Sequence, residues 1–229
     1  MIDLTISKAE GKESVREYAY RILRENILNL TLLPGTAISE QEISDTLAIS
    51  RTPVREAFIR LAQESLLEIR PQRGSYVSKI DTGQIAEFRF LRVTMEQAVV
   101  QLACRHFPDE FKEKLSDCLE KQCFCVKRRN YEQFFKLDNM MHDIIFTGCE
   151  KPHIWKIIQE ANLNYIRARV IDLSFKQDEI EVLFSQHSDI VKAIMESDEK
   201  LGYATITKHV NKVISDVDEL QRKYTELFK

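Results

Sequence analysis

Four side chains of types that bind metals fall on the apolar faces of three expected helices. In YEQFFKLDNMMHDIIF, residues 131–146, Asp138 and His142 are four residues apart and continue the apolar stripe, so both point inward. His187 and His209 hold similar positions in two later helical segments. Burying an ionisable group costs several kcal/mol unless it is paired or ligates a metal. One divalent metal ion of the zinc, nickel or manganese type would accept three imidazoles and one carboxylate and remove this cost.

The same four residues allow other interpretations. A single inward histidine is usually a hydrogen-bonded core residue, and His106 and His153, at helix ends, are not counted as ligands. Four protein ligands complete a tetrahedral ion, whereas a six-coordinate ion keeps positions for a small ligand. A hydrolytic metal site also needs a general base, and Asp143 points about 100° away from the neighbouring His142 on a helix. We therefore expect no enzyme activity.

The helices that carry these residues belong to an all-α segment, residues 81–229. This segment shows about six stretches of helical periodicity and no convincing strand. The stretches begin at residues that favour a helix N-terminus: Asp81 with Gln84, Pro108, Asn130 with Gln133, Pro152, Asp178 with Glu181, and Asp198. Antiparallel helices of this length form a bundle with a buried interior.

Residues 1–80 are organised differently. Apolar spacing predicts helices over Val15–Leu30, after the N-cap residue Ser39, and over Arg51–Glu64. The segment LLEIRPQRGSYVSKI, residues 66–80, then breaks the helical period at its proline and glycine and indicates a small β-hairpin. Three helices followed by a hairpin are typical of a winged helix-turn-helix, whose third helix enters the major groove of DNA. We predict a mainly α protein with this domain before the helical bundle.

Arg51 and Arg55 lie four residues apart on the exposed side of the third helix, where like charges repel each other. Phosphate oxygens or guanine edges would relieve that repulsion, and the helix N-terminus attracts phosphate. Thr52 shares this face, and Arg70 and Arg73 extend the basic surface into the hairpin. Residues 51–77 hold five arginines against three glutamates. From the charge spacing alone, Arg51 and Arg55 could also be ordinary solvated surface residues that contact no DNA.

The composition limits the class of protein. With 229 residues, 44% of them hydrophobic and 30% charged, the chain can fold into one large or two modest domains. A net charge of −3 argues against coating nucleic acid with the whole surface, so DNA contact must be local. Five cysteines without a C-x-x-C pair favour free thiols, and neither a signal peptide nor an apolar run of ~20 residues is visible. We expect a cytoplasmic protein that does not enter a membrane.

Residues 32–77 resemble the DNA-binding domain of GntR-family bacterial transcription regulators. The resemblance rests on a Pro-Gly turn before the second helix, on SRTPVREA at residues 50–57, and on RGSYV at residues 73–77. Many relatives carry arginine where this chain has Gln41, so a neutral hydrogen bond is expected to replace an ion pair with the DNA backbone there. With the charge pattern, the resemblance implies DNA contacts by Gln41, Arg51, Thr52, Arg55, Arg73 and Gly74.

Nearly everything after Ile80 resembles the FCD effector-binding domain of the FadR-like branch of that family. The D-x-x-x-H motif of this domain falls on Asp138 and His142, and its two later histidine ligands fall on His187 and His209. The resemblance implies a homodimer that binds a palindromic double-stranded DNA operator. It also implies that a small organic acid, bound in the metal-containing bundle, changes the spacing of the two DNA-binding domains.

In such relatives an arginine of the first bundle helix faces the ligand cavity and holds a carboxylate. An R-x-x-x-E pattern matches Arg92 and Glu96, although a surface ion pair would show the same spacing. Arg89 is a second candidate, and the directions of Arg167 and Arg169 are ambiguous. Besides a sensor, the sequence allows a constitutive DNA-binding regulator with a purely structural metal, or a metal-dependent hydrolase.

Overall fold

The computed structural model describes residues 2–161, 163–173, 180–215 and 217–229. The chain is mainly helical, as predicted, and it divides into two compact units. The first unit comprises Met1–Thr82, Leu163–Val170 and Asp218–Lys229, and the second comprises Gly83–Asn162 and Ile171–Val217. A domain boundary after residue 80 stays a prediction, because the first unit also draws on two later segments of the chain.

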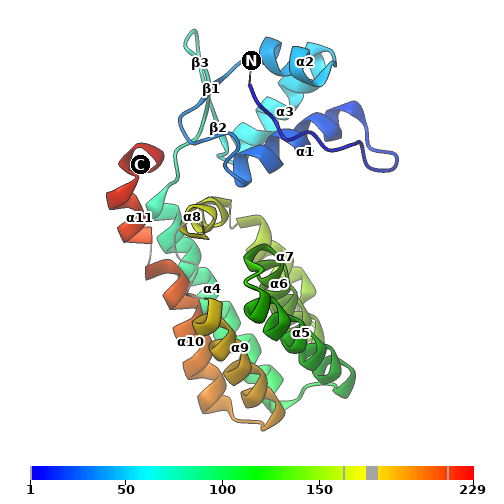
Figure 1. Cartoon of the computed structure of the whole chain (residues 1–229), viewed down its shortest axis with the longest axis vertical. Helices are drawn as coiled ribbons and strands as arrows, with labels where there is room; N and C mark the ends of the chain where they lie inside the picture. Colours follow the sequence, from blue (N-terminus) through cyan, green and yellow to red (C-terminus); the bar gives the residue numbers. More distant parts are fainter. Residues whose placement is uncertain (1, 162, 174–179, 216) are drawn as a thin grey trace. The chain divides into compact units, whose positions relative to one another are not determined.

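The N-terminal part of the first unit is a winged helix-turn-helix (Figure 1). Its helices are α1, Val15–Leu28, α2, Glu40–Leu47, and α3, Arg51–Gln63. Strands β2, Leu67–Arg70, and β3, Gly74–Val77, form the predicted hairpin. A short strand β1, Ala37–Ile38, pairs antiparallel with the other edge of β3, which gives the order β1-β3-β2. The sequence did not predict β1, because a strand of two residues cannot show an alternating pattern.

Serine residues precede all three helices of the winged helix-turn-helix, but they act differently. Ser14 forms a reciprocal capping box with Glu17, and Ser39 accepts a hydrogen bond from the backbone N–H of Glu42. Within the described part of the chain, the side chain of Ser50 makes no capping hydrogen bond to α3. The first turn of α3 also has no acidic residue, unlike the first turns of α1 and α2. The amide groups at the start of α3 are therefore available to an anion.

The core of the winged helix-turn-helix lies between α1 and α3, which pack against each other. Helical spacing places the apolar residues of both helices on facing stripes, and α2 and the hairpin add further apolar side chains. The fully buried members of this core include Ile22, Leu23, Ile27, Ile43, Val54, Phe58, Leu61 and Leu66.

Helix α8, Leu163–Leu173, contributes a buried arginine to the first unit. Arg167 is fully buried and donates hydrogen bonds to the carbonyl oxygens of Ser78, at 2.6 Å, and Lys79, at 3.4 Å, and to Oδ1 of Asn164. Burial lowers the pKa of Arg167 to about 10, so the guanidinium is still charged at neutral pH. The direction of Arg167 was ambiguous from the sequence, and the structure places it on the backbone that follows the hairpin.

The C-terminal segment completes the same unit. After α11, Val217–Lys223, and the short 3-10 helix Thr225–Leu227, the chain runs beside Ile80. The N–H of Ile80 donates to the carbonyl oxygen of Leu227 at 2.9 Å, and the N–H of Lys229 donates to the carbonyl oxygen of Ile80 at 3.0 Å. The backbone from Ser78 to Ile80 is thus held by two segments that are distant in sequence.

The second unit is a helical bundle. In the described part of residues 81–229 there are eight α-helices, whereas the sequence predicted about six. The segments predicted to begin at Pro152 and Asp198 each correspond to two described helices, which are separated by residues 162 and 216, outside the described ranges; the predicted start at Asp178 also lies outside them. The helices not yet given are α4, Thr82–Arg105, α5, Asp109–Arg128, α6, Tyr131–Gly148, α7, Pro152–Ala161, α9, Ile180–Met195, and α10, Glu199–Ser215.

Helix pairs α5–α6, α6–α7, α5–α9 and α9–α10 pack against each other. Figure 1 shows α5 beside α6 and α9 beside α10. Each described helix falls short of the combination of length and apolarity that crossing a membrane requires.

Replacing Arg167 with leucine should lower the stability of the protein by about 3 kcal/mol, because buried carbonyl oxygens would lose a charged donor. Thermal unfolding followed by circular dichroism measures this loss. The control Arg16→Leu removes an exposed arginine that lies 3.8 Å from Glu56 and should leave the melting temperature nearly unchanged. Equal melting temperatures for R167L and R16L would contradict the structural role of Arg167.

Candidate metal centre and nucleic-acid surface

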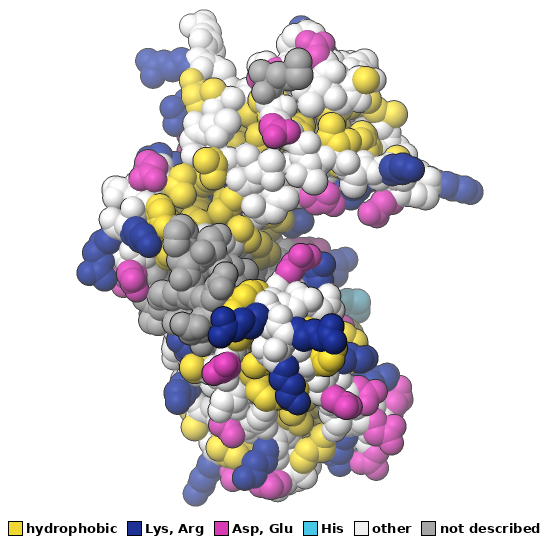
Figure 2. All heavy atoms as spheres, in the orientation of Figure 1, with side chains coloured by type: hydrophobic (Ala, Val, Ile, Leu, Met, Phe, Trp, Pro, Cys, Tyr) yellow, Lys and Arg dark blue, Asp and Glu magenta, His cyan; other side chains and the backbone are white. Residues whose placement is uncertain are grey.

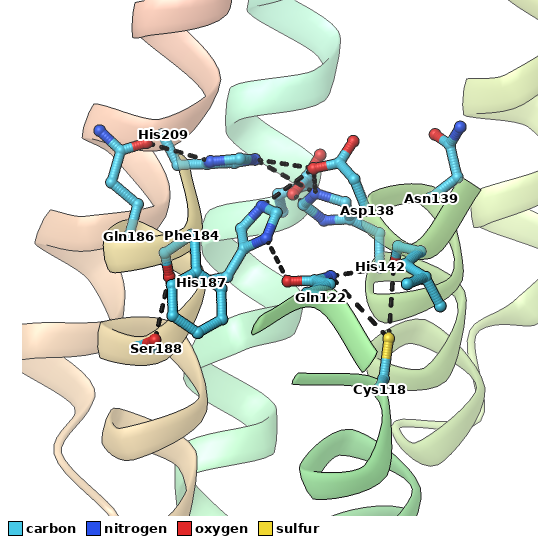
Figure 3. A network of polar contacts seen from close by, with 12 residues as sticks. Cys118, Gln122, Asp138, Asn139, His142, Phe184, Gln186, His187, Ser188 and His209 are labelled. Atoms are coloured by element: carbon cyan, nitrogen blue, oxygen red, sulfur yellow. Dashed lines mark hydrogen bonds and ion pairs between the residues drawn. The ribbon is translucent and has the colours of Figure 1, made fainter. Parts of the chain in front are cut away.

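The bundle brings together the four metal-ligand candidates that the sequence singled out. Asp138 and His142 lie one turn apart on α6, His187 comes from α9, and His209 comes from α10. Each of the four residues is at most 1% exposed to solvent. One ligand atom from each lies within 4.8 Å of the others. Figure 3 shows Asp138 and the three imidazole rings converging between the helices.

The spacing of these atoms fits a shared metal ion. The Oδ1 atom of Asp138 is 2.9 Å from Nε2 of His187, 3.7 Å from Nε2 of His209 and 3.8 Å from Nε2 of His142. The Nε2 atoms of His142 and His209 are 3.3 Å apart. Two donors that each lie ~2.1 Å from one ion are separated by about 3.0 Å in octahedral and about 3.4 Å in tetrahedral geometry. Imidazole nitrogen and carboxylate oxygen are also a donor set that zinc and related divalent ions accept.

The protonation state of His209 suits a metal ligand. The pKa of His209 lies well below its usual range, mainly because the ring is buried and also because His187 lies beside it. His209 is therefore neutral at neutral pH, and a neutral imidazole is the form that binds a metal.

Arg92 lies at the edge of this cluster. The side chain extends from α4, is 2% exposed, and is paired with Glu96 one turn later. Its Nη2 atom is 3.2 Å from Nε2 of His142. The carboxylate of Glu96 accepts from Arg92 through one oxygen and contacts Nδ1 of His142 at 2.8 Å through the other. Arg89, the second candidate from the sequence, is exposed.

The charges around Glu96 explain why a carboxylate can be buried here. Burial alone would raise the pKa of Glu96, but the charge of Arg92 and the contacts with Arg92 and His142 outweigh burial and hold this pKa below its usual range. The ring of Trp155 stacks on His142 with 5.4 Å between ring centroids, and it also faces Arg92. Arg92, Glu96 and His142 therefore form one buried electrostatic unit.

The sequence did not single out two buried glutamines beside the cluster. Gln122 of α5 and Gln186 of α9 contact the outer nitrogens of His187 and His209. Gln122 shares a buried stripe with Leu115, Cys118 and Cys125, at helical spacing. A glutamine on an apolar stripe was therefore a usable signal, and Gln186 gives the same signal between the buried residues Leu183 and Ile190 of α9.

The nucleic-acid surface candidates lie on the first unit. Arg51, Thr52 and Arg55 are all exposed on α3, opposite its buried stripe. A guanidinium nitrogen of Arg51 is 3.5 Å from a carboxylate oxygen of Glu40, but the arginine side chain is still 61% exposed. Gln41 is exposed on α2, where it donates a hydrogen bond to Asp45 at 2.8 Å. These side chains are free to meet a ligand outside the protein with little loss of internal packing.

The wing contributes two further candidates. Arg73 and Gly74 lie at its tip, where Gly74 has a φ of +97°, a conformation that favours glycine. Arg70 is oriented by Glu68, at 2.7 Å, and by the ring of Tyr76, 4.7 Å from its guanidinium carbon. Figure 2, drawn in the orientation of Figure 1, shows Lys and Arg side chains projecting near the end of the hairpin.

A winged helix-turn-helix with an exposed basic third helix, in one chain with a helical bundle that encloses an Asp/His₃ cluster, is the architecture of a bacterial transcription regulator with an effector domain. Residues 16–77 match the family described as "Bacterial regulatory proteins, gntR family", and residues 85–212 match the FCD domain. The chain belongs to the gntR family of bacterial regulatory proteins and carries an FCD effector-binding domain.

Curated relatives agree with this assignment. The chain is 32% identical over 216 residues to the HTH-type transcriptional repressor RspR of Escherichia coli K12, covering 94% of each chain. It is 31% identical over 223 residues to an HTH-type transcriptional regulator of Streptomyces ambofaciens, covering 97% of this chain and 93% of the relative. A gluconate operon transcriptional repressor of Bacillus licheniformis is 26% identical over 205 residues, covering 86% of this chain and 83% of that relative.

Solved structures share the fold. Escherichia coli McbR/YncC superposes with a TM-score of 0.71 at 18% identity, covering 91% of this chain and 99% of that one. A transcriptional regulator from Rhodococcus sp. RHA1 superposes with a TM-score of 0.71 at 18% identity, covering 90% of this chain and 99% of that one.

Adding Zn²⁺ to the metal-free protein should raise its melting temperature, because an ion that binds only the folded state adds about 2.7 kcal/mol at 100 times its Kd. The variant His209→Ala should lose this shift and the bound metal measured by mass spectrometry. The control His153→Ala removes an exposed histidine outside the cluster and should bind one ion per chain, as is expected of the wild type. Unchanged zinc content in H209A would exclude the cluster as the metal site.

Proposed function

We propose that this protein is a homodimeric, metal-containing transcription regulator that binds a palindromic operator and responds to a small carboxylic acid. It would act in the bacterial cytoplasm, where the chromosome lies. Asp138, His142, His187 and His209 would hold a divalent ion, which supplies a Lewis-acidic position for a carboxylate oxygen. Arg92 would supply a guanidinium for the same acid. On the DNA side, the contacts would come from Gln41, Arg51, Thr52, Arg55, Arg73 and Gly74.

The observation that carries the sensor proposal is the position of Arg92. A buried arginine 3.2 Å from a candidate ligand nitrogen places a fixed positive charge beside the metal cluster. Glu96 holds Nε of this arginine, while the planar fork of the group has further donors for a carboxylate. An arginine that served only to balance Glu96 would not need to lie against His142.

Coupling between acid and operator has one thermodynamic requirement. The acid can change operator affinity only if it binds two states of the dimer with different affinities. A six-coordinate ion has more positions than the four protein ligands fill, which would let the acid bind the metal directly.

A second candidate function is supported by the burial of the cluster. Ligand side chains that are at most 1% exposed suit a structural ion that clamps α6, α9 and α10 in a regulator that binds DNA constitutively. Chelation separates the two functions. A sensor metal is required for the response of operator binding to acid, whereas a structural metal affects the melting temperature alone.

The proposed function is tested with the metal-loaded protein and the DNA upstream of its own gene in a mobility-shift assay. A panel of small mono-, di- and hydroxycarboxylic acids is added at saturating concentrations, before and after removal of the metal with a chelator. A shift in operator affinity that disappears with the metal supports the sensor. If no acid changes operator binding, the result supports the constitutive regulator instead of the sensor.

Arg55→Ala should weaken operator binding by about 1–3 kcal/mol and reduce the slope of log K against log salt by about 1 per protomer, because a phosphate or base contact is lost. Fluorescence anisotropy at several salt concentrations measures both effects. Arg60→Ala is the matched control on α3, since Arg60 stacks 3.7 Å from the ring centroid of Tyr20 and pairs with Glu64. Equal losses for R55A and R60A would place the DNA surface elsewhere.

Arg92→Lys should retain metal but reduce the affinity for the active acid by about tenfold or more, because lysine keeps the charge and loses the fork that binds a carboxylate with two hydrogen bonds. Isothermal titration calorimetry with the acid found in the mobility-shift assay measures this loss. Arg89→Lys, an exposed substitution three residues away, should bind the acid as the wild type does. Wild-type acid affinity in R92K would remove Arg92 from the effector site.

A further inference from the structure

All three histidines of the cluster have an oxygen acceptor behind the ring. The Nδ1 atom of His142 is 2.8 Å from Oε2 of Glu96, that of His187 is 2.8 Å from Oε1 of Gln122, and that of His209 is 3.2 Å from Oε1 of Gln186. Figure 3 shows the two glutamine contacts on the sides of the rings that face away from Asp138. In each ring, the nitrogen that faces the other ligands is Nε2.

Gln122 is the member of this set whose orientation is best defined. Its Nε2 atom donates to the carbonyl oxygen of Leu137 at 3.1 Å, so its Oε1 atom must be the end that faces His187. A flipped amide would set its oxygen against the Leu137 carbonyl oxygen and its N–H against the ring. The side chain is 0% exposed, so water cannot compensate for a wrong orientation.

This orientation determines which nitrogen of His187 carries the proton. An amide oxygen can only accept, so Nδ1 of His187 must donate, and in the neutral ring the lone pair then lies on Nε2. That lone pair faces Oδ1 of Asp138 at 2.9 Å. Two acceptors at this distance repel each other unless a cation lies between them, which is the arrangement that a metal ion requires.

We propose that Gln122 is a positioning residue of the metal centre, which fixes His187 in the tautomer that presents Nε2 to the ion. The inference rests on the proposed metal site and adds a residue from α5, a helix that supplies none of the four ligands. Leu137, whose carbonyl oxygen anchors Gln122, directly precedes Asp138. One amide therefore links the backbone beside one ligand to the ring of another, across α5, α6 and α9.

Two substitutions separate this role from packing. Gln122→Leu removes both hydrogen bonds, whereas Gln122→Glu keeps an oxygen acceptor for Nδ1 of His187 and loses the donor to Leu137. Competition between the full-length protein and a chromophoric chelator for Zn²⁺ measures affinity. We expect about 10–100-fold weaker zinc binding in Q122L, the usual effect of losing such a partner, and an affinity within about threefold of wild type in Q122E. Both variants should melt at lower temperature without metal.

The matched control is Gln97→Leu. Gln97 of α4 is partly buried and donates a 2.6 Å hydrogen bond to Thr207, but it lies outside the cluster contacts. Zinc affinity should be unchanged in Q97L. Equal zinc affinities for Q122L and wild type, or equally weak binding by Q122E and Q122L, would overturn the positioning role.

The tautomer can also be read directly in the wild type. In zinc-loaded protein with ¹⁵N-labelled histidine, long-range ¹H–¹⁵N spectra should show the proton of His187 on Nδ1. A His187 ring that binds zinc through Nδ1 would refute the inference while leaving the metal site intact. A wild-type protein that binds no zinc, nickel or manganese would instead refute the proposed metal site, and the role of Gln122 with it.

Discussion

The stability of the bundle depends on how it compensates the ionisable side chains in an interior that excludes water. Arg92, Glu96, Asp138 and three histidines are each at most 2% exposed, and ionisable groups at such depth are unfavourable unless other groups neutralise them or donate to them. Arg92 and Glu96 neutralise each other, and the outer nitrogens of the rings have oxygen acceptors. Inside the cluster, Oδ1 of Asp138 faces the Nε2 atoms of the three histidine rings. A divalent cation fits between these atoms. The site exists only while α6, α9 and α10 keep their positions relative to one another.

The DNA-binding unit shows a related use of buried charge. Arg167 comes from α8, far along the chain, and its guanidinium donates hydrogen bonds to the carbonyl oxygens that follow the wing. The C-terminal segment holds the next residue, Ile80, by backbone hydrogen bonds. Backbone groups from Ser78 to Ile80 are therefore paired with residues of α8 and of the C-terminal segment. Residues Leu163–Val170 of α8 and the C-terminal segment thus belong to the unit that carries α3.

Much of the fold was predictable because its signals are local. Helix starts at Ser39, Asn130 and Pro152, and the hairpin around Gly74, depend on residues only a few positions apart. The motifs of the family resemblance also placed the winged helix-turn-helix in residues 32–77 of the chain. Strand β1 was missed because two residues carry no period.

The sequence by itself determined that Asp138 and His142 share a face of α6, since a spacing of four residues is one helical turn, and that Arg51, Thr52 and Arg55 face away from the core of α3. Only the tertiary structure decided that His187 and His209 meet Asp138, that Arg92 rather than Arg89 turns inward to them, that Gln122 lies behind a ring, and that Arg167 belongs with the wing. Helical periodicity fixes the directions of side chains relative to their own helix axis. Which faces of separate helices meet depends on the packing of all of them together, and no local pattern contains that information.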